Sequence, residues 1–192
     1  HCNFGKDDEH FEGALETIKD FQNKGKTRFI GLSDWSSSRI LKYIERCDPA
    51  VIQPYRNVMD DDYLTSGLKS YVDKNDIGVC FFSPIKHGLL TGKYNVPTSF
   101  ERGDHRSGIQ EFADKEIIDK MKHNKGMLKE RFDRHPYPEM RGVVDSLFND
   151  CPTGCVLLGQ RNKKQVEIAS TLGELMTDQD SEWVKSLYRN EG

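Results

Sequence analysis

Four short hydrophobic runs in this sequence each end in residues that are suited to binding or catalysis. The runs are residues 28–32, 51–55, 77–84 and 155–159. Polar, glycine or proline residues close each run, and after the first of them Ser33 and Asp34 supply a hydroxyl and a carboxylate. In α/β proteins the carboxyl ends of the strands carry the chemistry. We therefore expect a functional site where these runs end.

Helical patterns separate the four runs. Phe11, Leu15 and Ile18 recur at helical spacing, which predicts an amphipathic helix over 9–24 that ends before Gly25. Strands that alternate with helices in this way are typical of a parallel sheet with helical crossovers. Both a doubly wound sheet and a barrel fit this order. Further helices are predicted near residues 36–47, 63–75, 114–133, 140–148, 162–171 and 178–189.

The number of predicted strands indicates how much of a barrel this sequence contains. Residues 1–6 resemble the end of a fifth strand, so about four to five strands are expected, whereas a (β/α)8 barrel has eight. The sequence also begins at His1 without a methionine, and we expect it to be a piece of a longer chain. We predict one domain over 1–192, with a long loop at 86–114 that contains at most one short helical turn.

Composition narrows the class of protein. Charged residues make up 31% and the net charge is −3, which gives no general attraction to nucleic acid or anionic lipid. No apolar run approaches the roughly 20 residues of a membrane helix, and the first residues do not resemble a signal peptide. We expect a cytoplasmic protein with no membrane or nucleic-acid partner.

The cysteines are read as reduced thiols. There are five of them. Cys80 and Cys155 lie in predicted strands, where a thiol usually acts as a small buried apolar group. Cys151 and Cys155 are four residues apart, but no second Cys/His pair follows at the spacing of a zinc finger, so we expect no metal site.

Four segments resemble the aldo-keto reductase family. GKTRFIGLSDWS is similar to the family's GKIRYIGVSNFS, and VIQPYRNVMD resembles its strand with Q-x-x-YN. GVCFFSPIKHGLLTGKY resembles its SPL-x-x-GLLTGKY segment, and GQRNKKQVEIA its GaRN-x-x-Q-x-x-EN segment. The motifs occur in the family's order and span nearly the whole chain. The resemblance implies an α/β fold of the parallel TIM-barrel type, here its C-terminal portion, with the N-terminal strands absent.

The resemblance also implies a cofactor, NADP(H), and positions that hold its nicotinamide end. Ser33, Asp34 and Gln53 match residues that bind the carboxamide, which needs both a donor and an acceptor. Phe82 matches an aromatic residue that stacks on the nicotinamide ring. Asp34 departs from the family's asparagine and lacks its donor.

Two further segments match the phosphate-binding and adenine-binding positions. An Arg or a Lys near the adenosine end suits a phosphate monoester. The segment after the third run wraps the pyrophosphate, and the positions that match it are Ser83, Ile85, Gly88 and Leu89. The segment after the fourth run holds the 2′-phosphate and adenine, and its matching positions are Gly159, Arg161, Lys164 and Gln165. Ile168 and Ala169 replace a Glu-Asn pair that contacts adenine in the family.

The resemblance implies hydride transfer to a small-molecule carbonyl, an aldehyde or a ketone. His1 matches the active-site histidine that orients this carbonyl. The family's catalytic Asp, Tyr and Lys have no match in this sequence, so a non-catalytic binding or regulatory protein on the same scaffold is the alternative. We also expect the open sheet to be covered by a second copy or by a preceding segment.

Each of these positions also has a plainer interpretation. Gln53 can cap the edge of a strand, and Phe82 can belong to the core, although strand alternation requires either Phe81 or Phe82 to face outward. Arg161 and Lys164 can form the solvated start of a helix. For Arg106, in the long loop, we favour a structural role.

Overall fold

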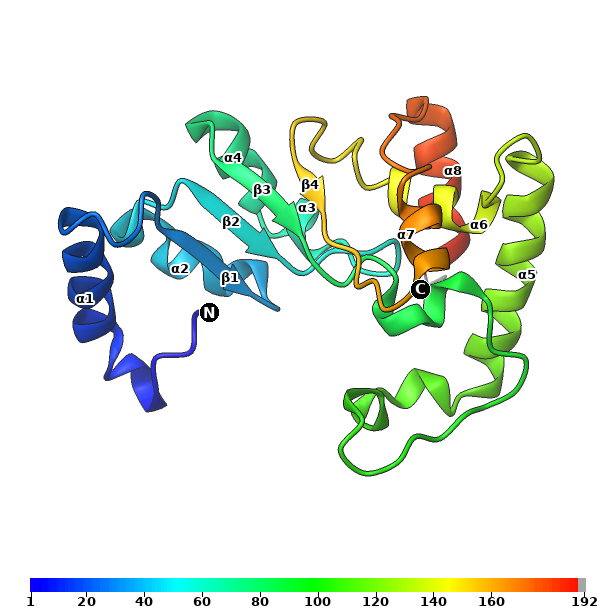
Figure 1. The fold of residues 1–192 in the computed structure, drawn as a ribbon, viewed down its shortest axis with the longest axis horizontal. Helices are drawn as coiled ribbons and strands as arrows, with labels where there is room; N and C mark the ends of the chain where they lie inside the picture. The colour runs from blue at the N-terminus through cyan, green and yellow to red at the C-terminus, as the bar shows by residue number, and fades with distance from the viewer. Residues whose placement is uncertain (190–192) are drawn as a thin grey trace. The chain divides into compact units, whose positions relative to one another are not determined.

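The computed structural model describes residues 1–189 (Figure 1). The chain forms two compact units. Unit 1 comprises His1–Arg56, Asp61–Phe82 and Thr153–Cys155, and unit 2 comprises Asn57–Asp60, Ser83–Pro152 and Val156–Gly192. The single domain over 1–192 stays a prediction. No helix among residues 1–189 has the length and apolar character of a transmembrane segment.

A four-stranded sheet in the order β1-β2-β3-β4 organises unit 1. The strands are β1 (Gly31–Asp34), β2 (Val51–Pro54), β3 (Gly78–Phe81) and β4 (Cys155–Val156). The pairings of β1 with β2 and of β2 with β3 are parallel, as predicted. Residues 1–6 form no strand, contrary to the prediction. The Cys2 N–H nevertheless donates to the Ser33 carbonyl at 3.0 Å.

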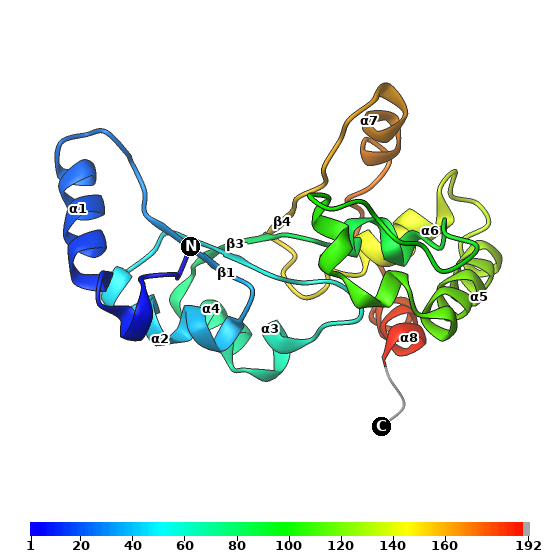
Figure 2. The ribbon, with the colours of Figure 1, turned by 90° about the horizontal axis from the view of Figure 1, so that it is seen from below.

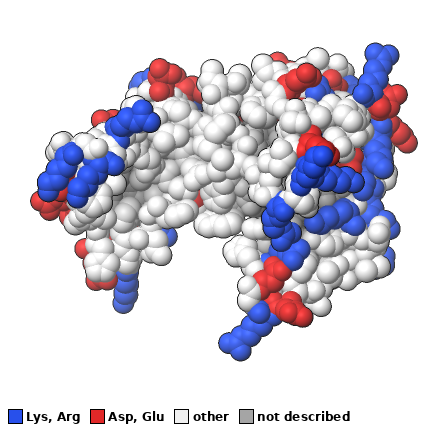
Figure 3. All heavy atoms as spheres, in the orientation of Figure 1, with Lys and Arg blue, Asp and Glu red and all other residues white. Residues whose placement is uncertain are grey.

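Helices cover one face of this sheet (Figure 2). Leu32, Ile52 and Val79 are buried against them, whereas Val51, whose side chain points the other way, and Gly78 are exposed. In Figure 3 the surface over β1–β3 is almost free of charged side chains. The elements of unit 1 outside the sheet are η1 (Lys6–Asp8), α1 (Phe11–Asn23), α2 (Ser37–Cys47), α3 (Asp62–Thr65) and α4 (Leu68–Asn75).

Local signals fix the ends of α1 and α2. Gly25 has φ +68°, and its N–H and that of Lys26 donate to the carbonyls of Gln22 and Phe21 at 3.0 and 2.8 Å. These two bonds make a Schellman motif and confirm the predicted helix end. At α2 the Ser36 hydroxyl accepts the N–H of Arg39 and caps the first turn of the helix.

Two predicted elements are different in the structure. The strand expected over 28–32 begins only at Gly31, because pairing with β2 starts there. Because β1 runs from Gly31 to Asp34, Ser33 and Asp34 lie inside the strand instead of following it. Phe29, which was expected inside the strand, is 65% exposed. The helix expected over 63–75 is two helices, since Gly67 adopts φ +91° between α3 and α4.

Unit 2 is built mainly from helices. Polar contacts connect its last helix to the rest of the unit: Asn124 Nδ2 donates to the Leu187 carbonyl at 2.9 Å, and Lys185 Nζ lies 2.6 Å from Asp150 Oδ1 with both side chains 5% exposed. Ser181 also donates to a backbone carbonyl at 3.1 Å. The helices are α5 (Lys115–Arg131), α6 (Pro138–Met140), the π-helical turn η5 (Arg141–Asp145), α7 (Lys163–Ala169) and α8 (Asp178–Tyr188).

The long segment 86–114 is more ordered than predicted. It contains three 3-10 helices instead of one turn: η2 (Lys86–Thr91), η3 (His105–Gly108) and η4 (Gln110–Phe112). Arg106 binds Asp104 through Nε at 2.9 Å and lies 4.1 Å from the centre of the Phe100 ring. The Arg106 side chain holds the pKa of Asp104 below its usual range. These contacts agree with a structural role for Arg106.

A substitution at Gly92 can test how closely this segment packs against α5. It has φ +60°, and a Cβ there would lie 2.7 Å from the Met121 carbonyl oxygen. We expect Gly92→Ala to lower the free energy of unfolding by on the order of 1–3 kcal/mol. Gly13→Ala is the matched control: nothing lies within 4 Å of its Cβ, and α1 should gain about 0.5–1 kcal/mol. Urea unfolding measures both, and equal effects would contradict this packing.

Candidate functional site

The predicted nicotinamide residues of unit 1 lie on neighbouring strands. Ser33 of β1 is opposite Gln53 of β2 in the parallel register, and Tyr55 forms a bridge with Phe82 one step further along. The Gln53 side chain is half-buried and lowers the pKa of the neighbouring Cys80 thiol, against the larger raising effect of burial. The carboxyl ends of three strands therefore bring polar and aromatic groups together.

Three aromatic rings meet at these strand ends. Trp35, Tyr55 and Phe82 each follow the last residue of a strand, and their ring centres are 4.8–5.5 Å apart. Phe81 points the other way and is 1% exposed, packed against Tyr63. The predicted alternation is therefore confirmed, with Phe82 as the outward ring. Tyr55 was not among the predicted site residues, although it stands in the Gln53 motif.

Asp34 and His1 have different surroundings. The Oδ1 atom of Asp34 accepts the N–H of Ser36 at 3.0 Å, which helps to fix the turn into α2. His1 is exposed and is followed by Cys2, which hydrogen-bonds to β1 beside Ser33. This bond places the backbone of Cys2, and so the start of the chain, beside β1.

A pocket in unit 2 collects residues from both predicted phosphate and adenosine segments. It has a volume of about 220 Å³. Four of the predicted positions line it: Ile85, Gly88, Gly159 and Gln165. The other lining residues are Thr91, Lys93, Lys125, Glu139, Met140, Leu158, Gln160, Ile168 and Ala169. The pocket thus has apolar walls with a few polar groups, the composition of a small-molecule site.

Gly88 brings a cation close to the pocket. It has φ +92°, and a Cβ at this position would lie only 3.0 Å from Lys93 Nζ. A side chain here would therefore compete with the ammonium group for space. Lys93 belongs to the GLLTGKY motif and was detectable there, whereas Lys125 comes from α5 and carried no signal in the sequence.

The other predicted residues of these two segments do not line the pocket. The Arg161 N–H donates to Gln165 Oε1 at 2.6 Å, which fixes this amide at the pocket wall. Arg161 is exposed, and its charge contributes to the lowered pKa of Asp104. Lys164 is exposed, Ser83 has φ +62° after β3, and Leu89 is fully buried in the core.

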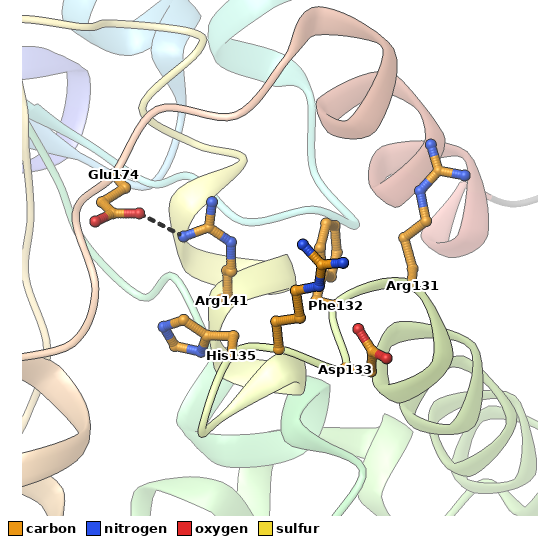
Figure 4. A pocket seen from close by; sticks show the side chains of 7 residues that line it. Arg131, Phe132, Asp133, His135, Arg141 and Glu174 are labelled. Atoms are coloured by element: carbon orange, nitrogen blue, oxygen red, sulfur yellow. Dashed lines mark hydrogen bonds and ion pairs between the residues drawn. The ribbon is translucent and has the colours of Figure 1, made fainter.

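A second, basic pocket lies at the C-terminal end of α5 and the loop that follows it (Figure 4). It has a volume of about 480 Å³. Its cations are mostly paired: Arg141 contacts Glu174 at 3.2 Å, and Arg131 contacts Asp180 outside the pocket at 2.7 Å. His135 accepts the Tyr137 N–H on Nδ1 at 3.1 Å and contacts a carbonyl through Nε2. These pairings indicate a structural junction.

Asp145 is the buried acid behind this junction. Its side chain has no exposed surface, and it lies 3.3 Å from Arg141 and accepts the Gly173 N–H at 2.9 Å. Burial raises the pKa of Asp145 from 3.8 to about 6, against the lowering effects of the Gly173 N–H and Arg141. The native state therefore holds this proton more tightly than the unfolded chain does.

The sign of this shift gives a pH prediction. The contribution of Asp145 to stability is fully present below its unfolded pKa of 3.8 and is lost as pH rises through about 6. We expect Asp145→Asn, which keeps an acceptor for Gly173, to remove a decline in the free energy of unfolding between these two pH values. Urea unfolding over this range measures it, with Asp133→Asn on the exposed surface as the control. Parallel pH curves for Asp145→Asn and the parent chain would contradict it.

Within residues 1–189 no three His, Cys, Asp or Glu side chains converge as the ligands of a metal would.

Comparison with known proteins places this chain in a family. The model of the Aldo/keto reductase family matches residues 1–189, so the chain belongs to this family. It is 25% identical over 150 residues to L-glyceraldehyde 3-phosphate reductase of Escherichia coli, covering 74% of this chain and 43% of the relative. It is 27% identical over 99 residues to the aldo-keto reductase yakc [NADP(+)] of Schizosaccharomyces pombe, covering 50% of this chain and 28% of the relative.

A solved structure shows the fold. The glycerol dehydrogenase AKR11B4 from Gluconobacter oxydans is similar with a TM-score of 0.73 and 24% identity, over 90% of this chain and 52% of that chain. The sheet described here is therefore part of a TIM-barrel-type fold, and its four strands are an incomplete set, as predicted. The chain spans about half the length of these relatives or less.

Proposed function

We propose that this chain carries the cofactor-binding half of an NADP(H)-dependent oxidoreductase that reduces an aldehyde or a ketone to an alcohol. The observation that supports this proposal best is the pocket of unit 2. Segments that follow two different strands supply Gly88 and Gly159 to one cavity, at the positions that the family motifs assign to the cofactor. A relative named for NADP(+) adds support for the choice of cofactor.

The pocket has suitable chemistry for the adenosine end. Leu158 and Ile168 offer apolar surface to a flat base, and Lys93 and Lys125 offer cations to phosphate. We assign the 2′-phosphate to Arg161 and Lys164, whose charges are exposed. Ser83 and Leu89 belong to the segment assigned to the pyrophosphate; Leu89 can contribute only its backbone, since its side chain is buried.

In unit 1 we assign the nicotinamide end to Ser33, Asp34, Gln53 and Phe82. Gln53 supplies the donor and acceptor that a carboxamide needs, and the outward ring of Phe82 supplies a flat face. NADPH, when bound, supplies the hydride. His1 orients the substrate carbonyl, and the proton donor and its Asp and Lys partners belong to strands outside this chain. The names of the relatives point to small polar carbonyl compounds as substrates.

The 2′-phosphate assignment can be tested with one substitution. Arg161→Met should weaken the binding of NADPH by about tenfold and leave NADH nearly unchanged, since only NADPH carries this phosphate. Titration calorimetry measures both cofactors. Lys163→Met is the control, because Lys163 contacts Glu167 and not the pocket. Equal losses for the two cofactors, or no binding of NADPH by the parent chain, would contradict the assignment.

A non-catalytic binding protein is the second candidate. It is favoured by Asp34, whose carboxylate replaces an amide and is already bonded to Ser36. The two candidates predict different results for a protein that carries this chain together with the preceding strands. The reductase should oxidise NADPH when simple aldehydes are added, whereas the binding protein should bind NADPH without turnover across the whole panel.

The same proposal extends to the location of the protein and to what covers its sheet. We propose a cytoplasmic location, and we propose that the uncharged face of the sheet, which includes Val51 and Gly78, is covered by a preceding segment or a second copy. Sedimentation of the isolated chain distinguishes these two covers: a dimer supports the second copy, and a monomer with exposed apolar surface supports the preceding segment.

A further inference from the structure

Two cysteine sulfurs meet where β3 lies beside β4. Cys80 is on β3 and Cys155 is on β4, and their Sγ atoms are 2.9 Å apart with both thiols free. A disulfide has a sulfur–sulfur distance of about 2 Å. The two sulfurs therefore need to approach by only a small distance, and neighbouring strands already hold the two backbones side by side.

The two thiols differ in their access to solvent. Cys155 is exposed and Cys80 is half-buried. Burial and the neighbouring thiol raise the pKa of Cys80 to about 12, so Cys80 is a poor first nucleophile. The other three cysteines, Cys2, Cys47 and Cys151, are buried. An oxidant in solution therefore meets Cys155 before the others.

We propose that Cys80 and Cys155 are an oxidation-sensitive dithiol that closes to a disulfide between β3 and β4 on exposure to a peroxide. This proposal rests on the position of the two sulfurs and is independent of the proposed reductase activity.

The reaction has two balanced steps. The thiolate of Cys155 attacks one oxygen of hydrogen peroxide; an S–O bond forms, the O–O bond breaks, and hydroxide leaves and takes up a proton. The sulfur of Cys80 then attacks the sulfur of Cys155; the S–S bond forms, the S–O bond breaks, and the thiol proton of Cys80 leaves with the oxygen as water. Two thiols are oxidised by two electrons in total, and one peroxide is reduced to two waters.

The product would join residues 75 apart in the sequence. A cross-link over such a long loop restricts the unfolded chain and raises the midpoint of thermal unfolding. The strand that it fastens, β4, contains only two residues and leads into Leu158 and Gly159 of the unit 2 pocket segment. Oxidation should therefore be visible as a reversible gain in thermal stability.

Peptide mapping after peroxide treatment tests the proposal. Trypsin leaves Cys80 on residues 75–86, whereas Cys151 and Cys155 share residues 142–161. The experiment therefore uses Cys151→Ser, which makes the link unambiguous. We expect the two peptides to be joined under non-reducing conditions, with a mass lower by two hydrogen atoms than their sum, and to separate after dithiothreitol. The melting midpoint should rise with oxidation and fall back on reduction.

Two single variants locate the steps, and a third is the control. Cys80→Ser should stop at the sulfenic acid of Cys155, which a dimedone label detects, and should show no rise in the melting midpoint. Cys155→Ser should give neither product, and Cys47→Ser should behave as the parent. Oxidation of Cys155 to sulfinic acid while Cys80 stays reduced in the parent chain would overturn the proposal. A disulfide between two chains through Cys155 would overturn it as well.

Discussion

The register of the parallel strands is the constraint on which the candidate site of unit 1 depends. Leu32 and Ile52 are partners in that register and are buried on the side of the helices. Because side chains alternate along a strand, burial of these residues forces Ser33 and Gln53 onto the opposite face as a second pair. A slip of one residue would bury the Gln53 amide and expose the core, so the apolar contacts determine that the sheet presents this amide. The Ser33 side chain on the same face is buried.

The pocket of unit 2 is formed by loops and helices and not by a strand register. Its walls are backbone segments and helix side chains, and their positions depend on turns with unusual dihedral angles and on local ion pairs. Gly88 and Gly92 both have positive φ in η2 and at its end. Lys86 contacts Glu111 at 2.5 Å, and Arg106 holds Asp104. These contacts stabilise a segment of short 3-10 helices and turns, so its glycines are held close to their neighbours.

The sequence predicted the parts of the protein that local rules determine. The end of α1 at Gly25 follows from backbone conformation, and the pocket positions Gly88 and Gly159 stand in recognisable motifs. Properties set by tertiary packing were not predictable: Lys125 reaches the pocket from a distant helix. Cys155 was expected in the core and is exposed, because its strand has two residues and lies at the end of the sheet order. The start of β1 was misplaced because apolar Phe29 lies outside the ladder.

The proposed cofactor site requires that the two segments lining the unit 2 pocket respond together to one nucleotide. Hydrogen exchange of backbone amides with and without NADPH measures this response. We expect slower exchange within residues 85–93 and within 158–169 at the same NADPH concentration, with α1 and α4 unchanged. Protection of only one of the two segments, or none at saturating NADPH, would contradict it.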